Sequence, residues 1–246
     1  MKILVVLPTY NEESILKENT LNLYNFLKNN FTDDWQIVIA DNGSTDRTGL
    51  IGKELANLHA EKIIYFFISQ KGRGGALKAA WLKFSADLYT FMDCDLATDL
   101  AHFPQMIEKL KNGNDVVVGS RLQNESDVER SFFRELTSRV FNLLRKILLD
   151  FKIKDSQCGF KGATKNVITQ ILPLVQNTQW FFDTEFLFLA QKNGFEIKEI
   201  PVRWKEAPNK KRRSLISVFK FSPDNIFKIS FDYLKEIWRL KKYDRN

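Results

Sequence analysis

The segment KILVVLPTYNE, residues 2–12, joins a continuous apolar run to a short polar motif. Runs of aliphatic and β-branched residues of this kind are typical of strands that are buried on both faces. Four further segments have the same character and are predicted as strands: 35–40, 62–68, 87–93 and 115–119. Predicted helices lie between the five strands, at residues 12–28, 46–58, 73–84 and 102–112. This alternation predicts a mostly parallel central sheet that is flanked by helices on both faces.

A polar motif follows each of the first four predicted strands. The motifs are PTYNE (8–12), DNGSTD (41–46), SQKGRGG (69–75) and DCDLATD (93–99). In parallel α/β sheets, ligands bind in the crevice beyond the carboxyl ends of the strands. We therefore expect the four motifs to meet at one edge of the sheet. Beyond residue 120 the alternation weakens, and we expect helices at 132–149, 164–171 and 180–194 and a strand at 195–204.

The composition is that of a folded protein with a substantial core. Of the 246 residues, 44% are hydrophobic and 27% are charged, as in ordinary globular domains. The longest apolar run, 63–68, is far shorter than the roughly 20 residues that span a bilayer. The N-terminus lacks the pattern of a signal peptide, so we expect a cytoplasmic chain. Neither Cys94 nor Cys158 has a Cys or His nearby at ligand spacing, which argues against zinc.

The positive charge is concentrated at the C-terminus. Residues 201–246 hold 13 Lys and Arg against 5 Asp and Glu, whereas the first 200 residues hold 24 against 25. This asymmetry indicates an anionic partner for the C-terminal part, although a solvated basic tail is the simpler alternative.

Asp93 and Asp95 stand one residue apart at the end of the fourth predicted strand. Carboxylates so close together repel each other, and desolvating them is costly unless a cation or a hydrogen-bond network compensates them. Oxygen ligands favour Mg²⁺ or Mn²⁺, which usually keep waters and bind substrate phosphates. We therefore expect Asp93 and Asp95 to be metal ligands; the alternative is that they cap the loop.

Glycines and basic residues alternate in SQKGRGGALKAAW, residues 69–81. Glycines allow backbone N–H groups to approach a ligand closely, and a helix N-terminus favours anions, so Lys71 and Arg73 are candidates for phosphate binding. The segment fits neither the dinucleotide fingerprint nor the P-loop, and an ordinary glycine turn is the alternative. Asp41, at the end of the second strand, is placed to accept a hydrogen bond from a base or a ribose.

In this order and spacing, the four motifs resemble the inverting family-2 glycosyltransferases, and the resemblance covers residues 2–205. It implies a GT-A (Rossmann-like) nucleotide-sugar-binding domain. The resemblance assigns Pro8, Tyr10 and Glu12 to the nucleotide site, together with Asp41, Lys71, Arg73 and Asp93. It assigns the divalent metal to Asp95 and Asp93, with Asp95 favoured for direct coordination.

The second half resembles the dolichyl-phosphate sugar synthases through VGSR (118–121), FFRELTS (132–138), DSQCGFKGAT (155–164) and WFFDTEFLFLAQKNGFEIKEIPVRW (180–204). DSQCGFK looks closer to the β-glucosyltransferase branch than to the mannosyl branch. The resemblance implies that Arg121 and Arg134 meet phosphates and that Asp155 and Gln157 lie at the reaction centre. It places Asp183 and Glu185 near the sugar. Arg121 in a surface ion pair and Glu185 as a helix cap are the alternatives.

The chain departs from the resemblance in two places. The family's late Gly-Ser-Lys reads Arg213-Ser214-Leu215 here, so Arg212, Arg213 or Lys211 would have to supply the missing charge at the acceptor. The transmembrane segments of many relatives are not found. A lipid substrate would then have to be reached in another way.

The expected reaction is the metal-dependent transfer of a hexose, with glucose favoured, from a nucleotide diphosphate sugar to a polyprenyl or dolichyl phosphate, with inversion. A phosphate acceptor needs no strong base, whereas a sugar hydroxyl, the alternative acceptor, needs a carboxylate such as Asp155 or Asp183. A nucleotide- or nucleic-acid-binding module is the alternative from another class. That alternative leaves the Asp93 and Asp95 pair unexplained, so we expect no nucleic-acid partner.

We expect two domains, a catalytic domain at 1–210 and a basic, amphipathic helical extension at 211–246. In the helix predicted at 223–242, Ile226, Ile229, Tyr233, Ile237 and Leu240 recur at spacings of three and four. This pattern, with its flanking lysines, favours peripheral attachment to the cytoplasmic face of a membrane. The alternative is a helix that packs on the catalytic domain or on a second subunit in a homodimer.

Overall fold

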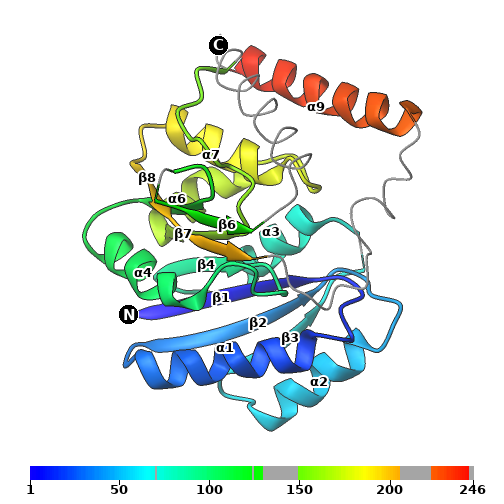
Figure 1. Ribbon diagram of the computed structural model, residues 1–246, viewed down its shortest axis with the longest axis vertical. Coiled ribbons are helices and arrows are strands. Elements are labelled where there is room, and N and C mark those ends of the chain that lie inside the picture. Colours follow the sequence, from blue (N-terminus) through cyan, green and yellow to red (C-terminus); the bar gives the residue numbers. More distant parts are fainter. Residues whose placement is uncertain (70, 124, 130–148, 206–222, 244–246) are drawn as a thin grey trace. The chain divides into compact units, whose positions relative to one another are not determined.

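A seven-stranded sheet forms the centre of the computed structural model, which describes residues 1–69, 71–123, 125–129, 149–205 and 223–243 (Figure 1). Its order is β3-β2-β1-β4-β7-β5-β8. The strands are β1 Lys2–Thr9, β2 Asp34–Asp41, β3 Ile63–Phe67, β4 Leu88–Met92, β5 Val116–Ser120, β7 Phe160–Thr164 and β8 Ile197–Pro201. β6 Asp127–Glu129 and β9 Arg203–Lys205 form a separate two-stranded sheet. The five predicted strands of the first half are confirmed to within a residue or two at each end.

Strand β7 is the one member of the large sheet that runs against its neighbours. It pairs antiparallel with β4 on one side and with β5 on the other, and Gly162 lies opposite both Thr90 and Val117. The sequence pattern does not predict this strand. Its segment FKGAT contains a lysine and a glycine and has no run of β-branched residues, so it lacks the usual pattern of a buried strand.

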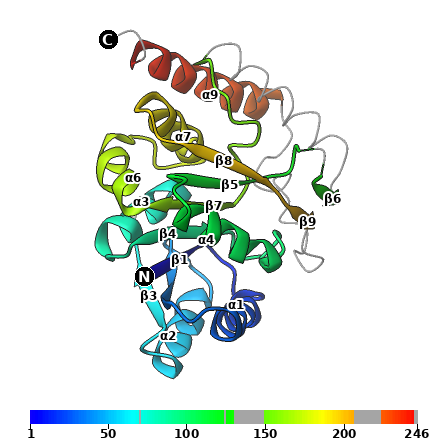
Figure 2. The same ribbon diagram turned by 90° about the vertical axis from the view of Figure 1, so that its left-hand side faces the viewer.

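Helices cover both faces of the sheet, as predicted. Their bounds are α1 Leu16–Asn30, α2 Thr48–Leu58, α3 Arg73–Lys83, α4 Phe103–Lys111, α6 Lys165–Ile171 and α7 Phe182–Lys192, with 3-10 turns at Leu100–His102 and Leu172–Leu174. Figure 2 shows α1 and α4 on one face and α3 and α6 on the other. On the first face, Ile3, Val5 and Leu7 of β1 belong to one buried cluster with Leu23 of α1 and Phe103 of α4.

Helix α1 begins four residues later than predicted, because the preceding loop is used for other contacts. Asn11 adopts a left-handed conformation with φ of 53°. Its backbone N–H donates to Ser44 Oγ, and that of Glu12 donates to Thr48 Oγ1, at 3.0 and 2.8 Å. The loops after β1 and β2 are therefore fastened to each other at the carboxyl edge of the sheet.

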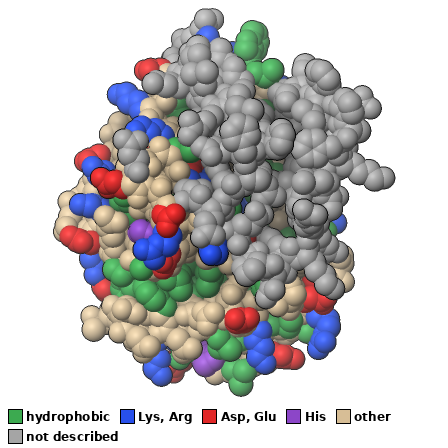
Figure 3. Space-filling view, in the orientation of Figure 1, with side chains coloured by type: hydrophobic (Ala, Val, Ile, Leu, Met, Phe, Trp, Pro, Cys, Tyr) green, Lys and Arg blue, Asp and Glu red, His purple; other side chains and the backbone are tan. Residues whose placement is uncertain are grey.

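The chain divides into two compact units, residues 1–128 with 153–205, and residues 129–152 with 206–246. Much of the second unit lies outside the described residues, so the division at residue 210 stays a prediction. Helix α9, Pro223–Tyr243, belongs to the second unit. Among the described residues, no helix is long and apolar enough to cross a membrane. In the first unit, acidic and basic side chains are mixed over the visible described surface (Figure 3), as the near-neutral charge of residues 1–200 leads one to expect.

Helix α3 approaches α7 so closely that only glycine fits at position 74. A Cβ atom built on Gly74 would lie 2.3 Å from Phe182 Cβ and 2.8 Å from the Gln179 carbonyl oxygen. We expect Gly74→Ala to lower the free energy of unfolding by about 2–3 kcal/mol, because backbone must move to accommodate the methyl group. Urea denaturation followed by circular dichroism measures this difference.

Gly75→Ala is the matched control on the same helix turn. Its Cβ would lie 3.3 Å from Thr178 Cβ and 3.7 Å from the Thr178 carbonyl oxygen, and the gain in helix propensity offsets part of the crowding. Equal destabilisation by the two substitutions would contradict the proposed close packing of α3 on α7.

Candidate active site

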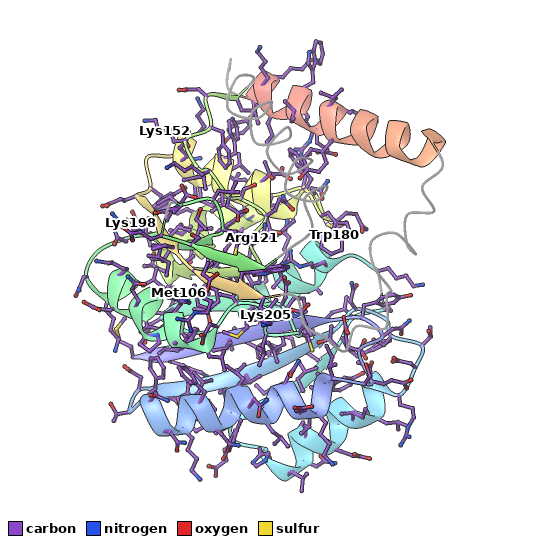
Figure 4. The ribbon with its side chains drawn as sticks, viewed as in Figure 1. Met106, Arg121, Lys152, Trp180, Lys198 and Lys205 are labelled. Carbon is purple, nitrogen blue, oxygen red and sulfur yellow. The ribbon has the colours of Figure 1, made fainter. Side chains whose placement is uncertain are left out.

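The loops after β1, β2 and β4 and the glycine segment before α3 meet at the carboxyl edge of the sheet, as predicted. Asn42, directly after β2, accepts a hydrogen bond through Oδ1 from the Gly72 backbone N–H at 2.7 Å. Asn42 N–H in turn donates to the carbonyl of Thr9, at the end of β1. Figure 4 shows Arg121, after β5, and Trp180, before α7, on the side of the sheet where the parallel strands end. These contacts define one polar site within the first unit.

Asp41 is held by donors of the protein itself. Its side chain is buried and accepts hydrogen bonds from Ser44 N–H at 2.9 Å and from the Tyr65 hydroxyl at 2.6 Å. Burial and then the neighbouring Asp41 carboxylate raise the pKa of Tyr65, so this hydroxyl remains a donor. The sequence analysis did not identify Tyr65, which lies within an apolar strand. The binding of a base or ribose by Asp41 stays a prediction.

The remaining residues assigned to the nucleotide lie around the same loops. Pro8 pairs with Ala40 across β1 and β2. Tyr10 is 40% exposed, and the ammonium group of Lys71 lies 5.3 Å from the centre of its ring. An exposed aromatic ring beside a cation is suited to a base or a phosphate, and the nucleotide contacts of Pro8, Tyr10, Glu12 and Lys71 stay predictions.

A buried network of charges lies behind the aspartate motif. The Arg73 guanidinium joins Asp93 Oδ1, 2.9 Å from Nη2, to Asp183 Oδ2, 2.5 Å from Nη1. Lys161 Nζ lies 2.9 Å from Asp183 Oδ1 and also donates to the Cys158 carbonyl. Burial by itself lowers the pKa of Arg73, but Asp183 and Asp93 outweigh it and raise that pKa above its ordinary value. Two cations thus balance two carboxylates.

Gly159, directly before β7, leaves room for the Asp93 side chain. A Cβ atom at position 159 would lie 1.8 Å from Asp93 Oδ2, and the Asp93 N–H donates to the Gly159 carbonyl at 3.0 Å. The Asp93 carboxylate is thus fixed between this backbone and Arg73. Even so, 42% of the Asp93 side chain is exposed.

Asp95 lies on the turn that follows, where Oδ1 accepts a hydrogen bond from the Ala97 N–H at 3.2 Å. In the part of the chain that the structure describes, no group of three or more His, Cys, Asp or Glu residues is arranged to hold a metal. Two carboxylates on one turn nevertheless fit a hard cation that takes its remaining ligands from water and a substrate diphosphate. The metal-binding role of Asp93 and Asp95 stays a prediction.

Arg121 and Asp155 form a bidentate ion pair that is almost completely buried. Arg121 Nε lies 2.7 Å from Asp155 Oδ2, and Nη2 lies 2.9 Å from Oδ1. Although burial opposes ionisation of Asp155, the Arg121 charge and its hydrogen bonds lower the pKa of Asp155 to about 2. Glu199 accepts from the Asp155 N–H, and the Trp204 ring centre lies 5.7 Å from the Arg121 guanidinium. The proposed surface ion pair of Arg121 is therefore a buried one.

Gln157 and Glu185 occupy different surroundings. Gln157 Nε2 donates to Thr184 Oγ1 at 2.9 Å, beside the charge network. Glu185 is fully buried, and its two oxygens accept from the backbone N–H groups of Gln176 and Asn177. These hydrogen bonds fasten the loop before α7 and do not cap the helix itself. The placement of Glu185 near the sugar stays a prediction.

The predicted acceptor residues Arg134, Arg212 and Arg213 lie outside the described residues. Among the described residues, the structure brings four further side chains to the candidate site that the sequence motifs did not indicate: Tyr65, Lys161, Trp180 and Glu199. A lysine in the middle of an otherwise apolar segment, as in FKGAT, was the one available indication for Lys161.

Curated proteins with similar sequences are glycosyltransferases. Glycosyltransferase AglD of Haloferax volcanii is 34% identical over 83% of this chain and 33% of its own length, so the present chain spans a third of that relative. Dolichyl-phosphate beta-glucosyltransferase of Saccharomyces cerevisiae is 32% identical over 97% of this chain and 77% of the relative.

Among solved structures, glucosyl-3-phosphoglycerate synthase of Mycobacterium tuberculosis, in complex with Mn²⁺ and UDP-glucose, has the same GT-A fold. Its TM-score is 0.62 over 87% of this chain and 73% of that chain, at 18% identity. The family model described as glycosyl transferase family 2 matches residues 4–172. The sequence and the fold thus agree, and the chain belongs to glycosyl transferase family 2.

Proposed function

We propose that this protein transfers glucose from UDP-glucose to dolichyl or another polyprenyl phosphate, with inversion at the anomeric carbon. The name of the yeast relative, which matches 97% of this chain, supports the acceptor and the sugar. In this reaction an acceptor phosphate oxygen forms a bond to the anomeric carbon, and the bond from that carbon to the nucleotide diphosphate breaks. UDP leaves from the opposite face.

The Arg121–Asp155 pair favours a phosphate over a sugar hydroxyl as the acceptor. A sugar hydroxyl must lose a proton to a base as it attacks, and efficient bases have a pKa near the working pH. Asp155, with a pKa of about 2, is far too weak a base for this task. The other candidate, Asp183, is enclosed by Arg73 and Lys161. A phosphate monoester, whose second pKa is about 6, arrives already ionised and needs no base.

For the donor, we propose that Asp93 and Asp95 hold Mg²⁺ or Mn²⁺ against the diphosphate of the sugar nucleotide. When bound, the ion would stabilise the negative charge that builds up on the departing UDP. Lys71, which lies beside Tyr10, would bind the same diphosphate from the glycine segment. Asp41, Pro8 and Tyr10 would orient the nucleoside.

For the acceptor, we propose that arginines bind the phosphate, because a guanidinium holds phosphate oxygens bidentately. Arg121 keeps 13% of its side chain exposed and is the described candidate. Arg134, Arg212 and Arg213 are the further candidates, from the resemblance alone. Gln157 and Asp183 would then lie near the transferred sugar.

We also propose that α9 attaches the protein to an anionic membrane surface, where a lipid acceptor resides. Leu234, Trp238 and Tyr243 are exposed, and the ammonium of Lys242 lies 4.5 Å from the centre of the Trp238 ring. Aromatic and basic side chains together are typical of helices that lie in the interface of a bilayer. Ile237 and Leu240, which the sequence analysis placed on this apolar face, are instead buried in the protein.

Incubation of the purified protein with Mn²⁺, dolichyl phosphate and labelled UDP-glucose tests the reaction. We expect labelled dolichyl phosphate glucose, and at least about 100-fold less of it with Asp95→Asn, because a ligand charge of the metal site is lost. Asp99→Asn is the matched control, since Asp99 lies on the same loop but caps a turn and pairs with Arg203. Faster turnover of GDP-mannose or of TDP-glucose would contradict the proposed donor.

The proposed absence of a base has a consequence for the pH dependence of acceptor use. We expect kcat/KM for the acceptor to rise with pH through about 6, as the acceptor phosphate loses its second proton. Asp155 contributes no such rise, because a group with a pKa of about 2 is already ionised in this range. An acceptor analogue with a more acidic phosphate should shift the rise to lower pH. A rise that stays at the same pH with both acceptors would indicate a base on the enzyme.

Membrane attachment is tested by co-sedimentation with phosphatidylserine vesicles. We expect the double variant Leu234→Ser/Trp238→Ser to sediment several-fold less than the wild type, because it removes apolar side chains from the proposed membrane face. Leu50→Ser, which replaces a leucine that is 60% exposed on α2, is the matched control and should sediment like the wild type. Equal sedimentation of all three proteins would contradict the proposed role of α9.

A further inference from the structure

Arg73 is a counter-ion of Asp93 in this structure. It joins that exposed aspartate to Asp183, of which 1% of the side chain is exposed. Asp183 also has Lys161 as a second cation, 2.9 Å away and equally buried. The two carboxylates therefore differ: Asp183 keeps a counter-ion if Arg73 moves, and Asp93 lies where solvent and a ligand reach it.

The guanidinium lies over two aromatic rings. Its central carbon lies 5.0 Å from the centre of the Phe91 ring and 5.5 Å from that of Trp180. Phe91 is buried, whereas Trp180 is 55% exposed. Aromatic faces attract a guanidinium and leave its N–H groups available for hydrogen bonds. Within the described residues, Arg73 Nε–H is buried without an acceptor, so the side chain has an unused donor.

We propose that Arg73 exchanges partners when the donor binds: its guanidinium leaves Asp93 and binds the diphosphate, while its other edge stays paired with Asp183. This inference rests on the proposed function, in which Asp93 and Asp95 hold a divalent cation. Arg73 is then a positioning residue that couples the metal to the nucleotide. A divalent cation alone has to compete with the guanidinium for Asp93 and is repelled by it. A cation that binds with a diphosphate meets no such competition.

The consequence is a specific thermodynamic coupling. UDP should increase the affinity for Mn²⁺, and by linkage Mn²⁺ should increase the affinity for UDP by the same factor. Removal of the guanidinium should have opposite effects on two affinities. The affinity for Mn²⁺ alone should increase, and the affinity for UDP in the presence of Mn²⁺ should decrease. A residue with a merely structural role would weaken both when it is replaced.

The test is a titration of the full chain with Mn²⁺, followed by the electron paramagnetic resonance signal of the unbound ion, with and without saturating UDP. For Arg73→Gln we expect about tenfold tighter binding of Mn²⁺ alone, the change that about 1.4 kcal/mol produces in an equilibrium constant. The enhancement by UDP should fall by a similar factor. The chain has five tryptophans, so the part of the fluorescence change on addition of UDP that Trp180→Phe removes reports the movement of the guanidinium. This part should also be lost in Arg73→Gln.

Lys71→Gln is the matched control. It removes one positive charge from the same segment, but Lys71 lies beside the Tyr10 ring. Within the part of the chain that the structure describes, the ion pair of Asp93 is made by Arg73 and not by Lys71. We expect it to weaken UDP binding and to change the affinity for Mn²⁺ alone less than threefold. If Arg73→Gln and Lys71→Gln gained equal affinity for Mn²⁺, the loss of one positive charge would explain the gain, and the proposal would be overturned.

Arg73→Lys keeps the test decisive if Arg73→Gln does not fold. A lysine retains the charge but does not bridge two carboxylates as the guanidinium does, so Mn²⁺ alone should again bind more tightly than in the wild type. Unchanged or weaker binding of Mn²⁺ by the folded Arg73 variant overturns the exchange. A wild type that binds neither Mn²⁺ nor UDP would instead overturn the proposed function itself.

Discussion

The reversal of strand β7 is the constraint on which the site depends. Seated between β4 and β5, it runs from the carboxyl edge of its parallel neighbours into the middle of the sheet. Its beginning therefore lies beside the aspartate motif at the end of β4, where Gly159 makes room for Asp93. Lys161, two residues later, reaches Asp183 from within the sheet. A parallel strand at this place would begin at the opposite edge and could not bring these residues together.

Compensation of buried charge explains most of the remaining architecture. Each buried carboxylate of the site has a defined partner: Asp155 has Arg121, Asp183 has Arg73 and Lys161, and Asp41 has a tyrosine hydroxyl and a backbone N–H. Leaving one such charge without its partner is strongly destabilising, whereas the intact pair adds little to stability. These pairs are thus better understood as fixing the positions of groups than as stabilising the fold.

The sequence predicted the outline of the fold because β1 to β5 are continuous apolar runs, and the motif residues because they follow those runs. It missed β7, since FKGAT lacks that pattern, and it began α1 early, since Asn11 and Glu12 bind the loop after β2 instead. It named Arg121 and Asp155 but not their pairing across 34 residues. Which distant charges meet is a property of the folded chain, and one sequence alone contains no record of it.

Lys161 has a practical consequence of its own. Its amine is enclosed between the sheet and helix α7, with 1% of the side chain exposed. Reagents that acylate lysines in water can reach it only after α7 moves away from the sheet, unlike lysines on the surface. The labelling rate of this one amine therefore measures how often α7 separates from the sheet, and comparing it with and without nucleotide would show whether a ligand at the edge slows that opening.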